Sequence, residues 1–470
     1  MLHSFMANAI DIVFGSVVLA IALVTAGHAV IYKRDPRSAA LWVLLAWLLP
    51  VAGAILYVLF GVNRVQRRAT RMRRDLVRLR TTSGSDERLP VSEMVPLARL
   101  VGEVVERPLL PGNSIEPLVD GVEAYPAMLE AIEQARASIG LASYIFHADG
   151  IGERFVDALI RAQRRGVAVR VLIDDVSCRF SLHSPAKRLR QASVPVGDFN
   201  PPVVPARLNA FNLRNHRKIL VVDGELGFTG GMNIDRRYWG EGAYRDLHFM
   251  LRGPVVAHLM EVFVDDWLFT TDEALRGPQW FPQLAAAGDS LARGIEAGPD
   301  EAFERLRWAY TGALNAAQRT VRICTPYFIP DGGLISALDA AALRGVDVDI
   351  ILPEETDLPH IRWAMIHQLW QVIERGCRVW MRPGPFDHSK LMVVDAHWSF
   401  IGSGNWDARS LRLNFEFNVE SYCRRLGRRM DELIVARRAA SRPVRLAELN
   451  ARPPAVKLRD GIARLFAPLL

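Results

Sequence analysis

One stretch of about twenty residues occurs twice in this chain. The first copy is NHRKILVVDGELGFTGGMN at 215–233, and the second is DHSKLMVVDAHWSFIGSGN at 387–405. The shared positions keep one offset of 172 residues: His216/His388, Lys218/Lys390, Asp223/Asp395, Gly230/Gly402, Gly231/Ser403 and Asn233/Asn405. The chain has only five lysines, and two of them stand two places after these histidines. A repeat this specific predicts two equivalent halves.

The residues around the two copies repeat in the same order. An amphipathic helix leading into a β-type stretch is expected over 127–146 and again over 305–330. A second helix, a glycine stop and a buried strand are expected over 154–175 and 334–353, with Gly166 and Gly345 as the stops. The pattern predicts a duplicated α/β domain in which helices cover both faces of parallel-type strands, and a pseudo-twofold axis relates the halves.

Two apolar runs precede this domain. Ile12 to Ile31 and Ala39 to Val62 carry no formal charge, and as helices both are long enough to cross a hydrocarbon core of about 30 Å. A cleaved signal peptide fits poorly, because no basic region precedes the first run and a second run follows at once. We expect two antiparallel transmembrane helices; a re-entrant hairpin is the alternative.

A basic tract follows the second run. Eight arginines stand between residues 64 and 80 against the single acid Asp75, whereas the short loop 32–38 holds Lys33, Arg34 and Arg37 against Asp35. The larger cluster predicts that both termini and the catalytic part are cytoplasmic. The tract fits a stop-transfer signal, contact with anionic headgroups, or both. Residues 81–86 (TTSGSD) form a polar linker.

The repeated residues suit a phosphodiester. His and Lys two apart on a strand point to the same face, so two halves together offer two imidazoles, two ammonium groups and two amides. Lys218 and Lys390, with Asn233, Asn405 and Ser403, are expected to hold the phosphate oxygens. One of His216 and His388 would attack phosphorus while the other protonates the leaving oxygen. The residues alone do not order the two histidines.

Further acids have expected roles at this site. A nucleophilic imidazole needs an acceptor on its far nitrogen; Asp246 follows His216 by 30 residues and Glu416 follows His388 by 28, so each copy has an orienting carboxylate. Asp223 and Asp395 complete the repeated His-Lys-Asp set, and we expect them to fix the loop that carries the Asn. Tyr327 and Phe328 fit an acyl entrance or the core equally.

The composition bears on whether the protein holds a metal, a disulfide framework or a cofactor. Four widely spaced cysteines without a Cys-x-x-Cys pair argue against a zinc cluster or a disulfide scaffold. No metal or other cofactor is expected, because the two ammonium groups supply the positive charge that Mg²⁺ gives elsewhere. The net charge of +7 suits an anionic partner.

The doubled motif resembles the signature of the phospholipase D superfamily, and within it the chain is similar to bacterial cardiolipin synthases. The stretches 35–63, 228–234, 325–331, 407–416 and 457–470 carry this resemblance. It implies two phospholipase D-like α/β sandwich lobes, at 111–290 and 291–470, after a membrane anchor at 1–63 and a basic linker at 64–110. Ser389 and Trp406 depart from the commoner Ala and aliphatic residue, which bears on donor or acceptor preference.

The resemblance also implies a reaction. A phosphatidyl group passes from one phosphatidylglycerol to another through a phosphatidyl-histidine intermediate, giving cardiolipin and glycerol in the bacterial inner membrane. His216 would be the nucleophile and His388 the acid and base. A membrane-bound phospholipase D that hydrolyses lipid to phosphatidic acid is the main alternative. Two membrane segments and the lack of a stacking platform disfavour a nuclease, and two intact motifs disfavour a non-catalytic scaffold. Oligomeric state stays open.

Overall fold

The computed structural model describes residues 2–33, 36–61, 92–175, 184–199, 214–299 and 304–466. The expected basic tract at 64–80 and the polar linker at 81–86 lie outside these ranges, as do Arg34 and Asp35 of the short loop. The chain divides into two compact units, the N-terminal helices and the α/β part.

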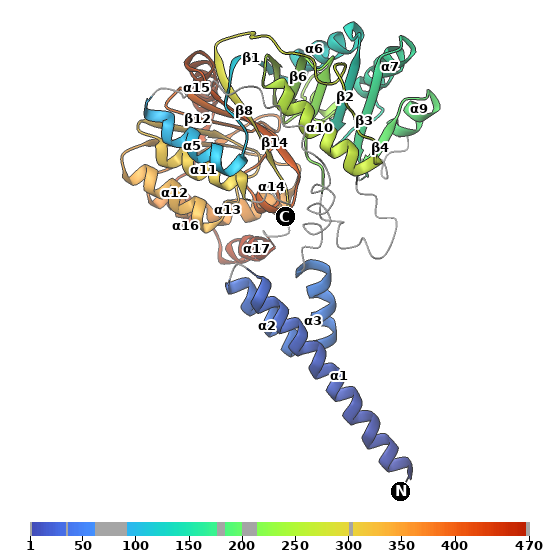
Figure 1. Ribbon diagram of the computed structural model, residues 1–470. Coiled ribbons are helices and arrows are strands. Elements are labelled where there is room, and N and C mark those ends of the chain that lie inside the picture. The colour runs from blue at the N-terminus through green and yellow to red at the C-terminus, as the bar shows by residue number, and fades with distance from the viewer. Residues whose placement is uncertain are drawn as a thin grey trace. The chain divides into compact units, whose positions relative to one another are not determined.

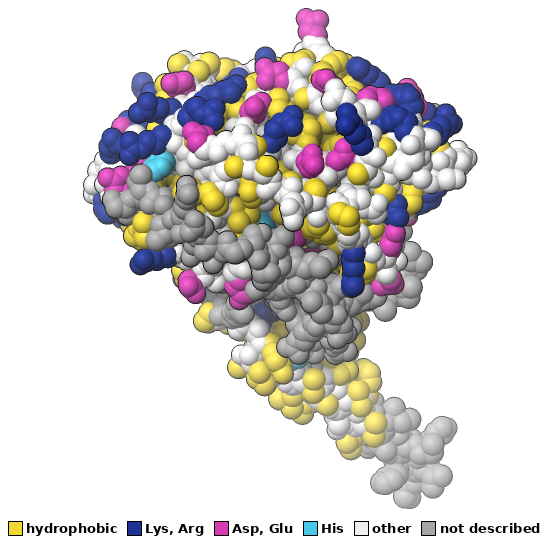
Figure 2. Space-filling model, turned by 45° about the horizontal axis from the view of Figure 1, so that its top comes forward, with side chains coloured by type: hydrophobic (Ala, Val, Ile, Leu, Met, Phe, Trp, Pro, Cys, Tyr) yellow, Lys and Arg dark blue, Asp and Glu magenta, His cyan; other side chains and the backbone are white. Residues whose placement is uncertain are grey.

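The described residues of the N-terminal unit form α1 (Leu2–Tyr32), α2 (Pro36–Leu48), α3 (Pro50–Leu56) and the π-helical turn η1 (Tyr57–Gly61). Within α1, Ile12–Tyr32 is long and apolar enough to cross a membrane, and it is the only such helix in the described part of the chain. The Tyr57 hydroxyl lies 2.8 Å from His28 Nδ1 and links η1 to α1. Figure 2 shows mostly hydrophobic side chains on the described surface of these helices, whereas charged side chains are spread over the visible face of the α/β unit.

The second expected transmembrane helix is not continuous. The apolar run breaks at Leu49, where the backbone leaves the helical region, and Pro50 opens α3. Proline has no N–H to donate and its ring obstructs the preceding turn, so a helix cannot pass through it undisturbed. The 13 residues of α2 span only about 20 Å, and Figure 1 shows α3 meeting α2 at an angle. Two membrane spans are therefore not confirmed.

The described strands of the α/β unit form one sheet in the order β15-β11-β10-β9-β12-β13-β14-β8-β1-β7-β6-β5-β2-β3-β4. The first half contributes β1 (Leu110–Val119), β2 (Ser138–Ser143), β3 (Ala168–Asp174), β4 (Val196–Phe199), β5 (Ile219–Val222), β6 (Leu226–Gly230) and β7 (Leu247–Arg252). The second contributes β8 (Ser290–Ala297), β9 (Thr320–Cys324), β10 (Asp347–Pro353), β11 (Arg378–Arg382), β12 (Leu391–Val394), β13 (Trp398–Gly402), β14 (Glu416–Tyr422) and β15 (Arg442–Pro443). The two halves join where β1 pairs with β8.

Helices cover this sheet in both halves (Figure 1). Those of the first half are α6 (Asp120–Gln134), α7 (Ile151–Arg164), α9 (Pro185–Gln191), η4 (Arg236–Tyr238) and α10 (Val256–Thr271). Those of the second are α11 (Arg305–Ala316), α12 (Gly332–Leu343), α13 (Pro359–Glu374), α14 (Ala408–Arg412), α15 (Arg424–Ala439), α16 (Leu446–Asn450) and α17 (Pro454–Leu465). Leu220 and Val222 of β5 share a core with α6 and α7, while Gly140 of β2 faces Phe263 of α10 across the other side. The predicted duplicated α/β fold is confirmed.

Part of the expected linker is folded. The turn η2 (Ser92–Met94) and helix α5 (Val95–Val105) precede β1. Leu97, Val101 and Val105 of α5 are buried in the core of the second half, with Ile295 and Leu306. The chain thus packs a helix against the second half before it enters the first.

The glycine stops are confirmed, but the strand directions differ from the prediction. Gly166 and Gly345 follow α7 and α12 with φ of +91° and +90°, a conformation that only glycine adopts at little cost. In each half only the outer strands run parallel, as β2–β3–β4 and β9–β10–β11. The motif strands β5 and β12 pair antiparallel with their neighbours, so the sheet is mixed.

Candidate active site

The two His-x-Lys segments lie just before β5 and β12, not within them as expected. Their backbones pair with the opposite half of the molecule. His216 N donates to Phe415 O at 2.9 Å, and His388 N donates to Arg245 O at 2.7 Å. Phe415 and Arg245 each precede an acid, Glu416 or Asp246. Each histidine is therefore carried next to the carboxylate of the other half.

The side chains follow this crossing. His216 Nδ1 lies 3.0 Å from Glu416 Oε2, and His388 Nδ1 lies 2.9 Å from Asp246 Oδ2. The sequence pattern indicates these two acids but predicts that each histidine pairs with the acid of its own copy. The structure corrects this pairing, because the backbone bridges between the halves bring together residues 142 and 200 positions apart.

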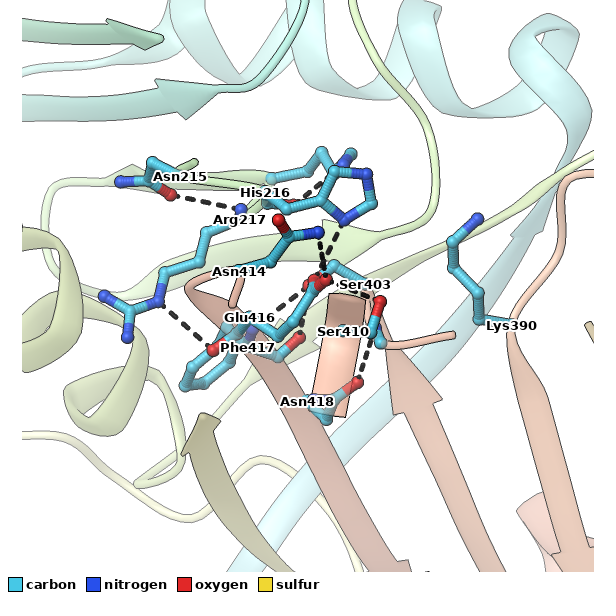
Figure 3. Close-up of polar contacts among 12 residues, drawn as sticks. Asn215, His216, Arg217, Lys390, Ser403, Ser410, Asn414, Glu416, Phe417 and Asn418 are labelled. Carbon is cyan, nitrogen blue, oxygen red and sulfur yellow. Dashed lines mark hydrogen bonds and ion pairs between the residues drawn. The ribbon is translucent and has the colours of Figure 1, made fainter. Parts of the chain in front are cut away.

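Glu416 is fully buried and held by several donors (Figure 3). The Ser403 hydroxyl donates to Oε2, the Ser410 hydroxyl donates to Oε1 at 2.9 Å, and Asn414 Nδ2 donates to Oε1 at 3.3 Å. Burial by itself would raise the pKa of Glu416, but its contact with His216, with the charge of Lys218 and the hydrogen bond from Ser403, lowers it below its usual value. Glu416 is therefore an ionised carboxylate.

Ser403 differs from its expected role. It was predicted to bind phosphate, yet its hydroxyl donates to Glu416 and accepts a hydrogen bond from Phe417 N at 3.0 Å. The equivalent residue of the first half is Gly231, where an added Cβ would lie only 2.4 Å from Asp246 Oδ1. The two copies therefore differ at this position. Ser403 holds Glu416 through its hydroxyl, whereas Asp246 occupies the space that a side chain at 231 would need.

Asp246 has a different environment from Glu416. It is fully buried and accepts a hydrogen bond from Leu247 N at 2.7 Å. Burial raises its pKa to about 7, against the opposing charge of Lys390. Tyr238, which the sequence analysis did not single out, lies with its hydroxyl 3.1 Å from His388 Nδ1. The His388–Asp246 pair therefore titrates close to neutral pH.

Both imidazoles are buried and uncharged at neutral pH. Burial lowers the pKa of His216 to about 4 even though Glu416 opposes the shift. Burial, with the charges of Lys390 and Lys218, lowers the pKa of His388 well below its usual value. A neutral His216 whose Nδ1–H donates to Glu416 presents its Nε2 lone pair, which is the form that a nucleophile requires.

The two lysines belong to the same electrostatic site. Lys218 Nζ donates to His216 O at 2.7 Å, and Lys390 Nζ lies 3.0 Å from His388 Nδ1. Burial, with the charge of Lys390, lowers the pKa of Lys218 to about 7, although Glu416 opposes the shift. Burial also lowers the pKa of Lys390, against the pull of Asp246 and Glu416. An anionic phosphate next to both groups would restore their positive charge.

The two asparagines are not equivalent. Asn233 Oδ1 accepts from Ile145 N at 3.2 Å, and its Nδ2 donates to Tyr238 at 3.4 Å. Asn405 is equally buried, but its Oδ1 has no hydrogen-bond partner within the described residues. A buried amide with spare hydrogen-bonding capacity is better placed than Asn233 to contact a substrate.

Asp223 and Asp395 lie away from the imidazoles. The Asp223 carboxylate accepts from the backbone N–H groups of Arg136, Ala137 and Ser138 at 2.7–3.1 Å. Asp395 accepts from the backbone N–H groups of residues 318, 319 and 320 at 2.8–2.9 Å. These acids fix the turns that begin β2 and β9, rather than the loop that carries the Asn.

Several residues near the imidazoles escaped sequence reasoning. The Tyr144 ring lies 4.9 Å from that of His216, and Lys218 Nζ lies 5.3 Å from the Tyr144 centroid. Tyr144 has no tyrosine at its repeat partner, so no doubled pattern could reveal it. Tyr327 and Phe328, which the sequence left between an acyl entrance and the core, are both buried in the core of the second half. Tyr327 also donates to Asp357 at 2.6 Å, and its ring lies 6.2 Å from His388.

No three His, Cys, Asp or Glu side chains converge as metal ligands in the described ranges. The cationic groups that the described part of this site offers are the lysines, with each imidazole when it is protonated.

Together, the buried His-carboxylate pairs and the doubled lysines on a duplicated α/β fold define an enzyme of the phospholipase D type. The sequence profile described as "Cardiolipin synthase, PLD-like domain" matches residues 128–267 and 310–435, and the "Phospholipase_D-nuclease N-terminal" profile matches 17–61. The chain belongs to the cardiolipin synthase family of the phospholipase D superfamily.

Individual relatives agree with this assignment. Cardiolipin synthase of Geobacillus kaustophilus is 32% identical over 452 residues, which cover 93% of this chain and 90% of that relative. The major cardiolipin synthase ClsA of Bacillus subtilis is 30% identical and covers 93% and 95%. Among solved structures, phosphatidylserine synthase of Haemophilus influenzae matches the fold with a TM-score of 0.63 at 17% identity, over 80% of this chain and all of that one.

Proposed function

We propose that this chain transfers a phosphatidyl group from one phosphatidylglycerol to the terminal hydroxyl of another, forming cardiolipin and releasing glycerol. The observation that carries the proposal is the pair of crossed contacts, His216 with Glu416 and His388 with Asp246. The cardiolipin synthases to which the chain is similar supply the substrate class.

In the first step, His216 Nε2 attacks the lipid phosphorus. A P–N bond forms, the bond from phosphorus to the glycerol oxygen breaks, and the His388–Asp246 pair gives that oxygen a proton through His388. In the second step, His388 takes the proton from the incoming hydroxyl, whose oxygen attacks phosphorus as the P–N bond breaks. The steps return both histidines to their starting forms.

The unequal environments of the two acids support this order. An ionised Glu416, held by Ser403, Ser410 and Asn414, keeps the proton of His216 on Nδ1 and leaves Nε2 free to attack. Asp246, with its pKa raised by burial to about 7, lets the His388 pair accept or release a proton near neutral pH. One half is thus suited to a nucleophile and the other to an acid and base.

The lysines and asparagines would act on the phosphate. Lys218 and Lys390 supply positive charge where negative charge builds up on the non-bridging oxygens. Asn405 Oδ1, an acceptor without a partner among the described residues, is assigned to a hydroxyl of the substrate. We assign Asn233 a weaker direct role, because its side-chain oxygen and nitrogen both form hydrogen bonds within the protein.

We further propose an inner-membrane location with the site on the cytoplasmic side. The support is the apolar stretch of α1 and the excess of arginine at 64–80. The segment from α2 to η1 would enter and leave the bilayer on one side as a re-entrant element, because its helices are too short to cross the bilayer. A site held against the bilayer meets lipid hydroxyls at high effective concentration, which favours transfer over hydrolysis.

The test is a product analysis. Full-length protein in vesicles receives phosphatidylglycerol labelled in its headgroup and in its acyl chains, and the products are separated. Cardiolipin and free glycerol in equal amounts support the proposal, whereas phosphatidic acid in place of cardiolipin would show a hydrolase. His216→Ala should abolish product, and His360→Ala, at an exposed histidine of α13, is the matched control.

A further inference from the structure

Helix α17 turns a charged residue toward the protein and apolar residues toward the outside. A helix packed on a protein normally turns apolar residues inward and charged residues outward. In α17 the most buried residue is Asp460, at 1% exposure, which pairs with Arg452 and Arg459. The outward side carries Leu458, Ile462 and Leu465, which are 66%, 48% and 78% exposed.

These outward residues form one continuous stripe. Leu458, Ile462, Leu465 and the following Phe466 are spaced by four, three and one positions, which places them on one helical face. Phe466 is itself 53% exposed. No described residue covers the stripe, although burying such side chains would stabilise the fold. An apolar stripe left open in this way indicates a surface that meets a partner.

The neighbouring helix α13 carries an exposed tryptophan. Figure 1 shows α17 at the edge of the second half, among α13 and α16. Arg459 lies 4.6 Å from the Trp363 centroid, and Gly461 faces His367. Trp370 is one turn beyond His367 on the same face of α13, and it is 43% exposed. A half-exposed tryptophan is typical of side chains at a membrane interface.

Basic residues border the stripe. Around the helix, Arg459 stands on one flank and Lys457 and Arg464 stand on the other. This combination, with the apolar stripe between cations, matches the interfacial helices that bind anionic lipid surfaces. The chain also carries an apolar segment long enough to span a bilayer, so the α/β unit is tethered to a chain that meets lipid.

We propose that the outward face of α17, with Trp370 of α13, lies in the surface of an anionic bilayer and docks the second half on the membrane. The docking goes beyond the proposed reaction. It bears on that reaction because α13 follows the segment of Asp357, which accepts a hydrogen bond from Tyr327 next to His388. Docking would hold the part of the site around His388 at the lipid headgroups.

The test measures lipid contact in the full chain without turnover. One cysteine at a time replaces Ile462 or Leu465 in a Cys178→Ser background, whose remaining cysteines Cys324, Cys377 and Cys423 are buried, and the introduced cysteine carries a polarity-sensitive fluorophore. Leu343→Cys, at an equally exposed leucine of α12, is the matched control. The proteins are placed in phosphatidylcholine–phosphatidylglycerol vesicles with or without nitroxide-labelled lipid.

We expect roughly threefold stronger quenching at 462 and 465 than at 343, because the apolar face of an interfacial helix lies about 5–10 Å deep in the headgroup region. Removing phosphatidylglycerol should weaken the quenching. Equal quenching at all three sites would overturn the proposal. So would a blue-shifted, unquenched signal at 462 and 465, which would mean that a second copy or another protein segment covers the face. Neither result depends on whether the enzyme makes cardiolipin.

Discussion

The equivalent histidines of the two motifs have different proposed roles because the carboxylates that they contact have different surroundings. His216 faces a carboxylate with three side-chain donors besides the imidazole, while His388 faces one that burial leaves close to protonation. The variation from Gly231 to Ser403 accompanies this difference. The asymmetry of the proposed mechanism therefore lies in residues outside the repeated His and Lys.

Ser410→Ala should shift the pH dependence of the reaction. Losing this donor to Oε1 destabilises the ionised form of Glu416 and raises its pKa. The acidic limb of the pH–rate profile should therefore move to higher pH. The rate of phosphatidyl transfer is measured from pH 5 to 8. Ser336→Ala removes a similar hydroxyl from exposed α12 and is the control. A uniform loss of rate with an unmoved profile would contradict the role of Ser410.

Buried histidines should make the protein sensitive to acid. His248 is fully buried, and burial with Lys218 lowers its pKa to about 3. Because the unfolded chain binds a proton below pH about 6.5 and the folded chain does not, stability falls as the pH drops, by about 1.4 kcal/mol per unit. His248→Asn, which copies Asn418 of the other half, should reduce the fall in Tm between pH 7 and 5. An unchanged fall would contradict the assignment.

At the level of elements, each motif acid ties two pieces of its own half together. Asp223 has φ of +54° and binds three backbone N–H groups where β2 begins, and Asp395 repeats the arrangement at β9. The strands β2 and β9 each pair with a motif strand. These acids therefore hold the frame of the site, although they do not reach it.

Asp223→Asn should lower stability without removing catalysis. Asparagine tolerates the left-handed backbone, but it offers one neutral acceptor in place of a carboxylate, at a cost of about 1–3 kcal/mol. Asp395→Asn should behave alike. Tm and the rate per folded molecule are measured together. A normal Tm with lost activity would place these acids in the chemistry instead.

At the level of the whole molecule, the site belongs to both halves of one chain. The bridges from His216 to Phe415 and from His388 to Arg245 cross between the halves, and each crossing brings an acid to the opposite imidazole. Among the described residues, neither motif histidine pairs with a carboxylate of its own half.

Mixing two inactive variants tests this arrangement. His216→Ala and His388→Ala chains, purified separately and reconstituted in the same vesicles, should give no cardiolipin, because each site needs both imidazoles from one chain. Wild-type protein at half the amount is the control. Recovery of activity in the mixture would show that two copies exchange halves to build a site.

The repeat in the sequence determined the duplicated fold, since equal patterns fold alike, and it pointed to the histidines, lysines and acids that the structure brings together. Only the tertiary structure decided which acid meets which imidazole. That pairing depends on backbone bridges between residues up to 200 positions apart, which local patterns do not encode. The break at Pro50 is the converse case: hydropathy measured the length of the apolar run, but the helical geometry around one proline divided it.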